Sequence, residues 1–170
     1  MGASLYVLRH AKAEVEARSG GDHGRDLRRR GRRAAKDVGR FLSSLGETPE
    51  RILCSTALRA RATAELARES GGFAAEVELL PQLFGASAPA LLALLSELGR
   101  GERVLLVGHE PALSQLIGVL SGAEIEFPPG ALARIDLLCE RWSELGPLVG
   151  RLVWLVTPEL VVARRTRTRA

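Results

Sequence analysis

The sequence predicts an α/β protein in which helices cover both faces of a mostly parallel sheet, a three-layer α/β/α sandwich. Short apolar runs without polar alternation, such as residues 5–8 and 104–107, indicate strands that are buried on both faces. Segments with apolar residues at three- and four-residue steps separate these runs and indicate helices. A chain of 170 residues is long enough for one domain with a substantial core.

Glycine and proline residues mark the expected ends of the helices. An apolar stripe over residues 31–45 ends before Gly46, and a helix over residues 57–69 is stopped by Gly71 and its neighbour. Proline in the first turn opens the next helix at Pro89. In chain order, the expected strands cover residues 5–8, 51–55, 77–80, 103–107, 131–138 and 152–156, and the expected helices cover residues 31–45, 57–69, 89–98 and 111–120.

Two segments lie outside this alternation. Residues 11–30 are polar and hold three glycines without an apolar period, so we expect a loop that covers the functional site. The chain ends in closely spaced arginines, and we expect a basic, disordered tail over residues 164–170. We find no internal repeat, and residues 1–163 are expected to form the single domain.

Arginine dominates the positive charge of the chain. The formal net charge is +4, and Lys12 and Lys36 are the only lysines among 24 basic residues. Aromatic residues form 4% of the chain and do not interrupt the arginine blocks, so we do not expect a nucleic-acid partner. Cys54 and Cys139 lie far apart in the sequence, which argues against a disulfide framework or a zinc site. Since no apolar run approaches the roughly 20 residues that span a bilayer, we expect a cytoplasmic protein without a membrane partner.

Two of the three histidines follow directly after predicted buried strands. Arg9 and His10 follow residues 5–8, and His109 follows residues 103–107 after one glycine. Ligands of open α/β sheets bind outside the carboxyl ends of the strands. The two imidazoles and the guanidinium are therefore expected at one edge of the sheet, where they indicate a site for an anion such as phosphate.

A third strand end adds another cation to this edge. Arg59 lies in the first turn of the helix after the strand over residues 51–55, where free N–H groups and the helix dipole favour anions. Cations gathered in this way repel one another unless an anion lies between them. The candidate catalytic residues are Arg9, His10, Arg59 and His109. No cluster of metal ligands accompanies them, and we expect neither a metal ion nor another cofactor.

Six short motifs extend this pattern along the chain. They are Leu8-Arg9-His10-Ala11, Arg25-Asp26-Leu27 with Gly31, Ser55 with Leu58-Arg59-Ala60 and Thr63, Leu80-Pro81-Gln82-Leu83, Val107-Gly108-His109-Glu110-Pro111, and Trp154 with Thr157-Pro158 and Leu160. In order and spacing they resemble the histidine phosphatase superfamily, which includes the phosphoglycerate mutases, and within it the small SixA-type phosphohistidine phosphatases. The resemblance covers most of the chain and implies a phosphoglycerate mutase-like fold.

The resemblance implies a phosphatase that needs no metal ion. His10 corresponds to the nucleophile that takes the phosphoryl group, and histidine is among the side chains that form such covalent intermediates. Arg9, Arg59 and a protonated His109 would bind the non-bridging oxygens, since phosphoryl transfer is catalysed mainly by positioning and charge.

Three further residues are candidates for contacts with phosphate or substrate. Arg25 stands where the family places an arginine near its pocket. Lys12 lies two residues after the nucleophile, and His23 lies in the loop expected over the site. The alternative for each of the three is an ordinary solvated side chain.

The sequence departs from the family at the proton donor. Gln82 stands where the related segment has glutamate, and the acidic segment that supplies a proton donor in the mutase branch is not found. Glu110 and Asp26 are the possible substitutes. Ala11 replaces the usual glycine after the nucleophile, which is tolerated if its φ is negative. Phosphohistidine, whose leaving nitrogen is protonated from water, fits a site without a strong acid better than a sugar alcohol phosphate does.

These observations favour hydrolysis of protein phosphohistidine in signalling, with a phosphorylated protein as the partner. Two alternatives stay open. One is a small-molecule phosphomonoesterase that acts on a sugar or nucleotide phosphate. The other is a module that binds phosphate or phosphoproteins without turnover, which the missing proton donor leaves conceivable.

Overall fold

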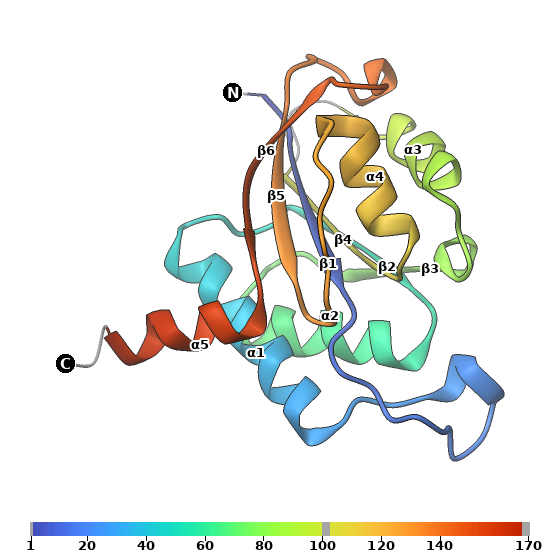
Figure 1. Cartoon of the computed structure of the whole chain (residues 1–170), viewed down its shortest axis with the longest axis vertical. Helices are drawn as coiled ribbons and strands as arrows, with labels where there is room; N and C mark the ends of the chain where they lie inside the picture. Colours follow the sequence, from blue (N-terminus) through green and yellow to red (C-terminus); the bar gives the residue numbers. More distant parts are fainter. Residues whose placement is uncertain (1, 100–102, 168–170) are drawn as a thin grey trace.

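The computed structural model describes residues 2–99 and 103–167 of the chain. Its helices are arranged around a central sheet (Figure 1). The strands are β1 (Ser4–Arg9), β2 (Arg51–Ser55), β3 (Val77–Leu80), β4 (Arg103–Gly108), β5 (Leu132–Leu137) and β6 (Gly150–Val156). The α-helices are α1 (Arg29–Ser44), α2 (Leu58–Gly71), α3 (Ala88–Ser96), α4 (Ala112–Ser121) and α5 (Pro158–Arg167), and short 3₁₀ helices are η1 (Gly21–Gly24), η2 (Pro81–Leu83) and η3 (Trp142–Glu144).

The strands form one mixed, mostly parallel sheet in the order β3-β2-β4-β1-β5-β6. The first four strands in the chain pair in parallel, whereas β5 pairs antiparallel with both β1 and β6. Within the described residues, β5 is thus the one strand that runs against the others. The predicted fold class is confirmed. Since β2, β4 and β1 are neighbours at the centre, the side chains that follow their carboxyl ends are brought side by side.

Alternate residues of the central strands enter two separate hydrophobic clusters. On β1, Leu5 and Val7 pack with α3 and α4 on one face of the sheet. Tyr6 and Leu8 pack with α1 and α2 on the other face. The unbroken apolar run predicts this burial on both faces, because neither face of the strand meets water.

The structure corrects two expectations about the polar segments. The loop over residues 11–30 contains the helix η1, and α1 begins at Arg29, two residues earlier than expected. Residues 164–167, expected to begin a disordered tail, instead continue the helix α5. Proline opens this helix, and arginine and alanine are good helix formers, so the helix extends into the basic segment. Residues 168–170 of the expected tail lie outside the described residues.

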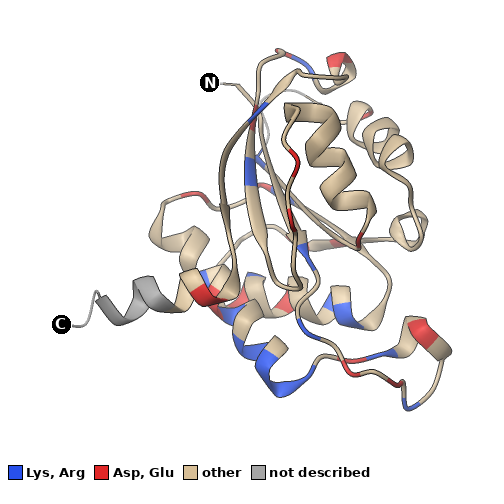
Figure 2. Ribbon diagram, viewed as in Figure 1, with Lys and Arg blue, Asp and Glu red and all other residues tan. Residues whose placement is uncertain are grey.

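An exposed basic surface surrounds the start of α1 (Figure 2). Its arginines are paired with scattered carboxylates: Arg28 with Glu14, Arg30 with Glu159 and Arg32 with Asp26. Exposed pairs of this kind contribute little to stability. The main effect of this surface is therefore to place positive charge beside the loop over residues 11–30. Its contribution to the stability of the fold is small.

The two cysteines are free thiols, and Cys54 is buried in the sheet. Burial raises the pKa of the Cys54 thiol, so this side chain behaves as a small apolar core residue. No helix within residues 2–99 and 103–167 combines the length and the apolar character that crossing a membrane requires.

Gly31 allows the start of α1 to lie against the loop that follows the first histidine. A Cβ atom at this position would overlap the carbonyl oxygen of Lys12. The same carbonyl oxygen accepts a hydrogen bond from the N–H of Arg28 at 2.9 Å. Packing therefore explains the glycine at position 31. It allows α1 to lie close to the residues that follow β1.

We predict that Gly31→Ala lowers the free energy of unfolding by about 1–3 kcal/mol, the range for overpacking a close contact. Alanine gains about 1 kcal/mol over glycine inside a helix, so any net loss reports the overlap with Lys12. Urea unfolding measures the difference. Gly118→Ala, inside α4, is the matched control, since a Cβ there meets its nearest atom at an ordinary 3.4 Å, and equal changes of stability in both variants would contradict the prediction.

Candidate active site

The carboxyl edge of the sheet brings the four predicted catalytic residues together. Arg9 ends β1 and His10 follows it, while His109 follows β4. Arg59 lies in the first turn of α2, and its Nε is 3.3 Å from His10 Nε2. The ring centroids of His10 and His109 are 5.2 Å apart. His10 is 9% exposed and Arg59 5%, so the cluster is largely withdrawn from water.

The main chain fixes the position of the proton on the His10 ring. His10 Nδ1 lies 2.9 Å from the carbonyl oxygen of Ala11, which only accepts hydrogen bonds, so Nδ1 donates and Nε2 keeps a lone pair. Burial, assisted by the charges of Arg59 and Arg9, lowers the pKa of His10 to about 4, although the bond to Ala11 opposes the shift. The ring is therefore neutral at pH 7, and its Nε2 is suited to act as a nucleophile.

Ser55 holds the second histidine. His109 Nε2 lies 2.8 Å from Ser55 Oγ, and the same oxygen accepts a hydrogen bond from the N–H of Ala57. Burial, then the neighbouring His10 and Arg59, lowers the pKa of His109 to about 3. We expected a protonated His109, but in the free protein the ring is neutral. An imidazolium at this position requires the negative charge of a bound anion to favour it.

Two buried polar atoms of the cluster have no partner among the described residues. They are His109 Nδ1 and Arg9 Nε. Arg9 Nη1 donates to the carbonyl oxygen of Phe127 at 2.8 Å, which fixes the guanidinium. Burial lowers the pKa of Arg9, although the charge of Glu110 opposes the shift, and a guanidinium remains charged at neutral pH. Because an unpaired buried N–H is costly, the unpartnered Arg9 Nε favours binding of an anion, whose oxygens would accept from it.

Asp22 supplies a carboxylate to the cluster that the sequence analysis did not identify. Arg59 Nη1 donates to the Asp22 carbonyl oxygen at 2.6 Å, and Arg59 Nη2 donates to Asp22 Oδ2 at 2.9 Å. Arg25 Nε donates to Asp22 Oδ1 at 2.8 Å. Slight desolvation raises the pKa of Asp22, but the hydrogen bonds and charges of Arg59 and Arg25 outweigh it and hold this pKa below its usual value. The available signal was an acidic residue beside glycines in the loop expected over the site.

Thr63 ties α2 to the residue after the nucleophile. Its Oγ1 accepts a hydrogen bond from the N–H of Ala11 at 3.0 Å and donates to the carbonyl oxygen of Arg59 at 2.7 Å. In the described part of the chain, Leu148 is the only non-glycine residue with a positive φ. Ala11 therefore has a negative φ, and the condition for an alanine in place of glycine is met.

The side chain of Arg25 contacts the cluster, whereas the side chain of Lys12 does not. Arg25 reaches it through the ion pair with Asp22, and its charge acts on His10. Lys12 contributes its carbonyl oxygen to the packing of α1, while its side chain is exposed. Of these two candidates, Arg25 has the position of a residue that helps to hold an anion.

The third candidate, His23, lies at the mouth of the cluster. His23 Nε2 is 3.0 Å from Thr56 Oγ1, which joins η1 to the segment before α2. The His23 ring stands edge-on to Phe84 at a centroid distance of 4.9 Å. Phe84 in turn stands edge-on to His109 at 5.8 Å. The sequence analysis named His23 but not Phe84, which lies in none of the motifs.

The two expected proton donors are held by other groups. Glu110 Oε1 accepts a hydrogen bond from the N–H of Ser114 at 2.9 Å, although its charge reaches Arg9. Both carboxylate oxygens of Asp26 accept hydrogen bonds from Arg32. Among the described contacts, neither carboxylate is hydrogen-bonded to the two histidines. Their role as proton donors stays a prediction, and Glu110 has the better position because it lies beside His109 in the chain.

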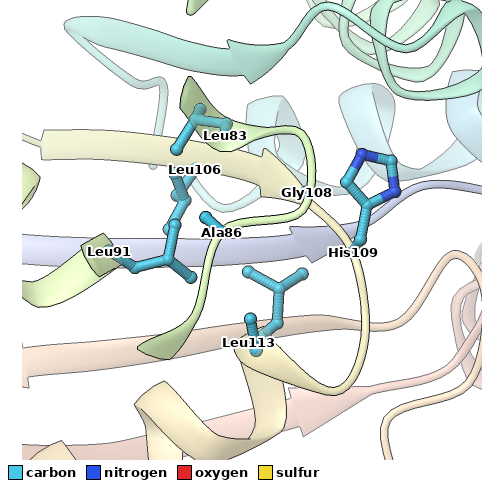
Figure 3. Close-up of a pocket in the computed structure, with 8 residues that line it drawn as sticks. Leu83, Ala86, Leu91, Leu106, Gly108, His109 and Leu113 are labelled. Atoms are coloured by element: carbon cyan, nitrogen blue, oxygen red, sulfur yellow. The ribbon is translucent and has the colours of Figure 1, made fainter. Parts of the chain in front are cut away.

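A small apolar pocket lies beside His109 (Figure 3). Leu83, Leu106 and Leu113 line it, and the His109 ring points away from these side chains. The pocket therefore packs against the backbone at His109, while the ring itself faces the catalytic cluster. In the ranges 2–99 and 103–167, no group of three or more His, Cys, Asp or Glu residues is arranged to hold a metal ion.

Known proteins resemble this chain in sequence and in fold. The sequence profile of the histidine phosphatase superfamily (branch 1) matches residues 5–86. An uncharacterized chloroplastic protein of Arabidopsis thaliana is 30% identical over 169 residues, which cover 91% of this chain and 78% of that protein. The structure of a proposed phosphohistidine phosphatase SixA from Nakamurella multipartitia is 27% identical with a TM-score of 0.81, covering 93% of this chain and 97% of that one. The structure of the protein histidine phosphatase SixA complexed with tungstate is 25% identical with a TM-score of 0.75, covering 93% and 99%.

We predict that Arg59→Ala lowers kcat/KM for p-nitrophenyl phosphate by about 100-fold, the scale for removing one preorganised donor. Arg59→Lys should recover only part of this loss, because an ammonium does not form two parallel hydrogen bonds. Arg61→Ala, an exposed position on the same helix, is the matched control and should keep the native rate. Equal initial rates of the Arg59→Lys variant and the native protein would place Arg59 outside the site.

We predict that the His10 ring of the free protein stays neutral until the pH falls to about 4. NMR titration of the ring signals, assigned with the His10→Asn variant, measures the midpoint. Because the folded pKa lies below the ordinary value of 6.5, the unfolded chain binds a proton that the folded chain does not between these pH values. Stability should therefore fall as the pH is lowered through this window. Inorganic phosphate should raise the midpoint, and a midpoint near 6.5 without it would contradict the prediction.

Proposed function

Because this chain belongs to the histidine phosphatase superfamily (branch 1), we propose that it hydrolyses protein phosphohistidine through a phosphohistidine intermediate on His10. The match to the histidine phosphatase superfamily and the SixA phosphatases among the similar structures support phosphatase activity for this chain. The observation that carries the proposal is the bond from His10 Nδ1 to the carbonyl oxygen of Ala11. This bond leaves Nε2 unprotonated, beside a guanidinium and a second imidazole, an arrangement that supports attack on a phosphoryl group.

In the first step, the lone pair of His10 Nε2 forms a bond to phosphorus. The bond from phosphorus to the substrate nitrogen breaks, and its electron pair returns to that nitrogen. The substrate imidazole carries a proton on its second nitrogen, so it leaves as neutral histidine. The phosphorylated His10 ring keeps its Nδ1 proton and becomes cationic, and the carbonyl oxygen of Ala11 stabilises this charge by accepting the proton's hydrogen bond.

Positive groups around His10 hold the phosphoryl oxygens during the transfer. Arg59 and the unpartnered Nε of Arg9 donate to these oxygens. The dianionic phosphoryl group favours the protonated form of His109, whose Nδ1–H then donates as well. Such positioning and charge stabilisation supply most of the catalysis in phosphoryl transfer, so the reaction requires no metal ion.

In the second step, a water oxygen forms a bond to phosphorus. The bond from phosphorus to His10 Nε2 breaks, and its electron pair returns to Nε2, which restores the neutral ring. One proton of the water passes to solvent, and inorganic phosphate leaves. Arg59 then returns to the Asp22 carboxylate that it binds in the free protein.

The carboxylates near the site support phosphohistidine as the substrate class. Glu110 and Asp26 are engaged by other groups, and Asp22 is held ionised by two arginines. None of these carboxylates is thus in a good position to donate a proton to an alkoxide. A leaving imidazole needs no proton from the enzyme, because its second nitrogen is protonated from water. The SixA phosphatases among the similar structures support the same choice.

The proposed partner is a phosphorylated protein in a reducing cytoplasm. Two free cysteines support this compartment, since neither is paired in a disulfide. The exposed arginines at the start of α1 (Figure 2) would favour approach of an acidic protein surface. Sugar and nucleotide phosphates are the competing substrates, and their hydrolysis would need a proton donor, whereas Glu110 and Asp26 are engaged by other groups.

The experiment compares kcat/KM for a phosphohistidine protein, aryl phosphates and alkyl phosphates such as glycerol phosphate. We predict that phosphohistidine and aryl phosphates are hydrolysed at least 100-fold faster than alkyl phosphates, on the scale of general acid catalysis that is missing. EDTA should leave every rate unchanged. His10→Ala should abolish turnover while keeping the fold, since its side chain follows a strand end.

An acid-labile, base-stable phosphoryl group should be trapped on His10 with a slow substrate. Substantial turnover by His10→Ala, or an adduct on another residue type, would reject the covalent mechanism. Alkyl phosphates turned over as fast as aryl phosphates would instead reveal a proton donor and favour a metabolite phosphatase. Phosphate binding without any turnover would favour the non-catalytic binding module.

A further inference from the structure

Phe84 is a large apolar side chain that stays exposed at the mouth of the site. It is 40% exposed, although its neighbour Leu83 is 3% exposed and lines the apolar pocket beside His109. The Phe84 N–H donates to the carbonyl oxygen of Pro81, and Gly85 follows with a φ of 76°. The turn therefore sends Leu83 into the core and leaves the Phe84 ring at the surface beside the catalytic cluster.

Ring contacts connect Phe84 to the reacting atoms. His10 lies 5.2 Å from His109, His109 lies 5.8 Å from Phe84, and Phe84 lies 4.9 Å from His23, all between ring centroids. The two contacts of Phe84 are edge-on, with interplanar angles of 82° and 81°. This row of rings leads from a nucleophile that is 9% exposed to an exposed loop residue.

The outer rings are held in place on both sides. His23 Nε2 is 3.0 Å from Thr56 Oγ1, and the adjacent Ser55 holds His109 through its hydroxyl group. The last residue of β2 and the residue that follows it thus position both histidines that flank Phe84. An aromatic ring fixed in this way presents a flat surface without losing much conformational freedom when a partner covers it.

The direction of the reaction brings the leaving group to this surface. In phosphoryl transfer the attacking and leaving atoms lie roughly in line on opposite sides of phosphorus. The leaving group lies on the side of phosphorus opposite His10 Nε2, and because His10 is buried while Phe84 and His23 are exposed, we infer that it departs toward these exposed rings. Planar rings bind aromatic side chains in offset or edge-on arrangements, which a ringless leaving group does not form.

We propose that Phe84 and His23 form a subsite for the planar ring of the leaving group. Under the proposed function, on which this identification rests, the ring is the imidazole of the substrate phosphohistidine. Asp22, at the same mouth, presents a carboxylate that accepts a hydrogen bond from the second, protonated nitrogen of such a ring. The subsite selects for a ring as well as for a labile phosphoryl group.

The test compares ring-bearing with ringless substrates that are both labile. Phosphohistidine and p-nitrophenyl phosphate carry a ring, and acetyl phosphate and phosphoramidate do not. In Phe84→Ala the ratio of kcat/KM for ring-bearing to ringless substrates should fall roughly 3- to 10-fold, the range of one aromatic pair. Phe84→Leu should give an intermediate ratio, because it keeps apolar bulk without a ring. Leu138→Ala, at an exposed apolar residue on another part of the surface, should keep the native ratio.

A second readout does not depend on turnover. The native protein should bind phenylphosphonate more tightly than methylphosphonate, and Phe84→Ala should remove most of this preference, measured by calorimetry. An unchanged ratio in Phe84→Ala, or equal losses for all ligands, would overturn the subsite, and equal losses would show that Phe84 only positions His109. If the native protein hydrolyses p-nitrophenyl phosphate but not phosphohistidine, the proposed substrate is rejected. The ratio of kcat/KM for p-nitrophenyl phosphate to that for acetyl phosphate, and the relative affinity for the two phosphonates, still test the subsite.

Discussion

The Arg59 guanidinium is the interaction on which the arrangement of the site depends. It donates through Nε to His10, and through its two terminal nitrogens to the carbonyl and carboxylate oxygens of Asp22. It thereby joins the end of β1, the start of α2 and the loop that carries η1. At 5% exposure, a guanidinium needs such partners, because burying a charge without hydrogen bonds is costly. Any anion that enters the site must therefore share or replace the bonds to Asp22.

Burial of this cluster sets the protonation of both histidines before substrate arrives. The pKa values of His10 and His109 fall to about 4 and about 3, with desolvation as the largest cause for each. A neutral His10 is what attack on phosphorus requires, whereas a neutral His109 is a weaker ligand for phosphate. The buried environment thus favours the neutral form of His10, which attack on phosphorus requires. It disfavours the charged form of His109 until an anion has bound. In the proposed mechanism, the phosphoryl group itself completes the charge distribution of the site.

The sequence predicted the strand ends of the site better than its loops. Unbroken apolar runs identified β1 and β4, and parallel pairing then placed His10 and His109 at one edge without further information. Asp22 was not identified, because its contact with Arg59 spans 37 positions and a loop without periodicity carries no signal for it. Phe84 was missed for a similar reason, since only the turn before Gly85 directs its ring outward. The helix over residues 164–167 was missed because the dense arginines favoured disorder over helix propensity.

The state of Asp22 limits the chemistry available at this site. Two arginines outweigh its slight desolvation and hold its carboxyl group ionised, so it accepts hydrogen bonds and does not supply a proton. With Glu110 bonded to the N–H of Ser114, the described carboxylates are better arranged to accept a hydrogen bond from a leaving group than to protonate a basic one. An imidazole with a protonated second nitrogen meets this condition, and an alkoxide does not. The same residue that occupies Arg59 in the free protein therefore also supports the proposed substrate, in which nitrogen and not alkoxide oxygen is the leaving atom.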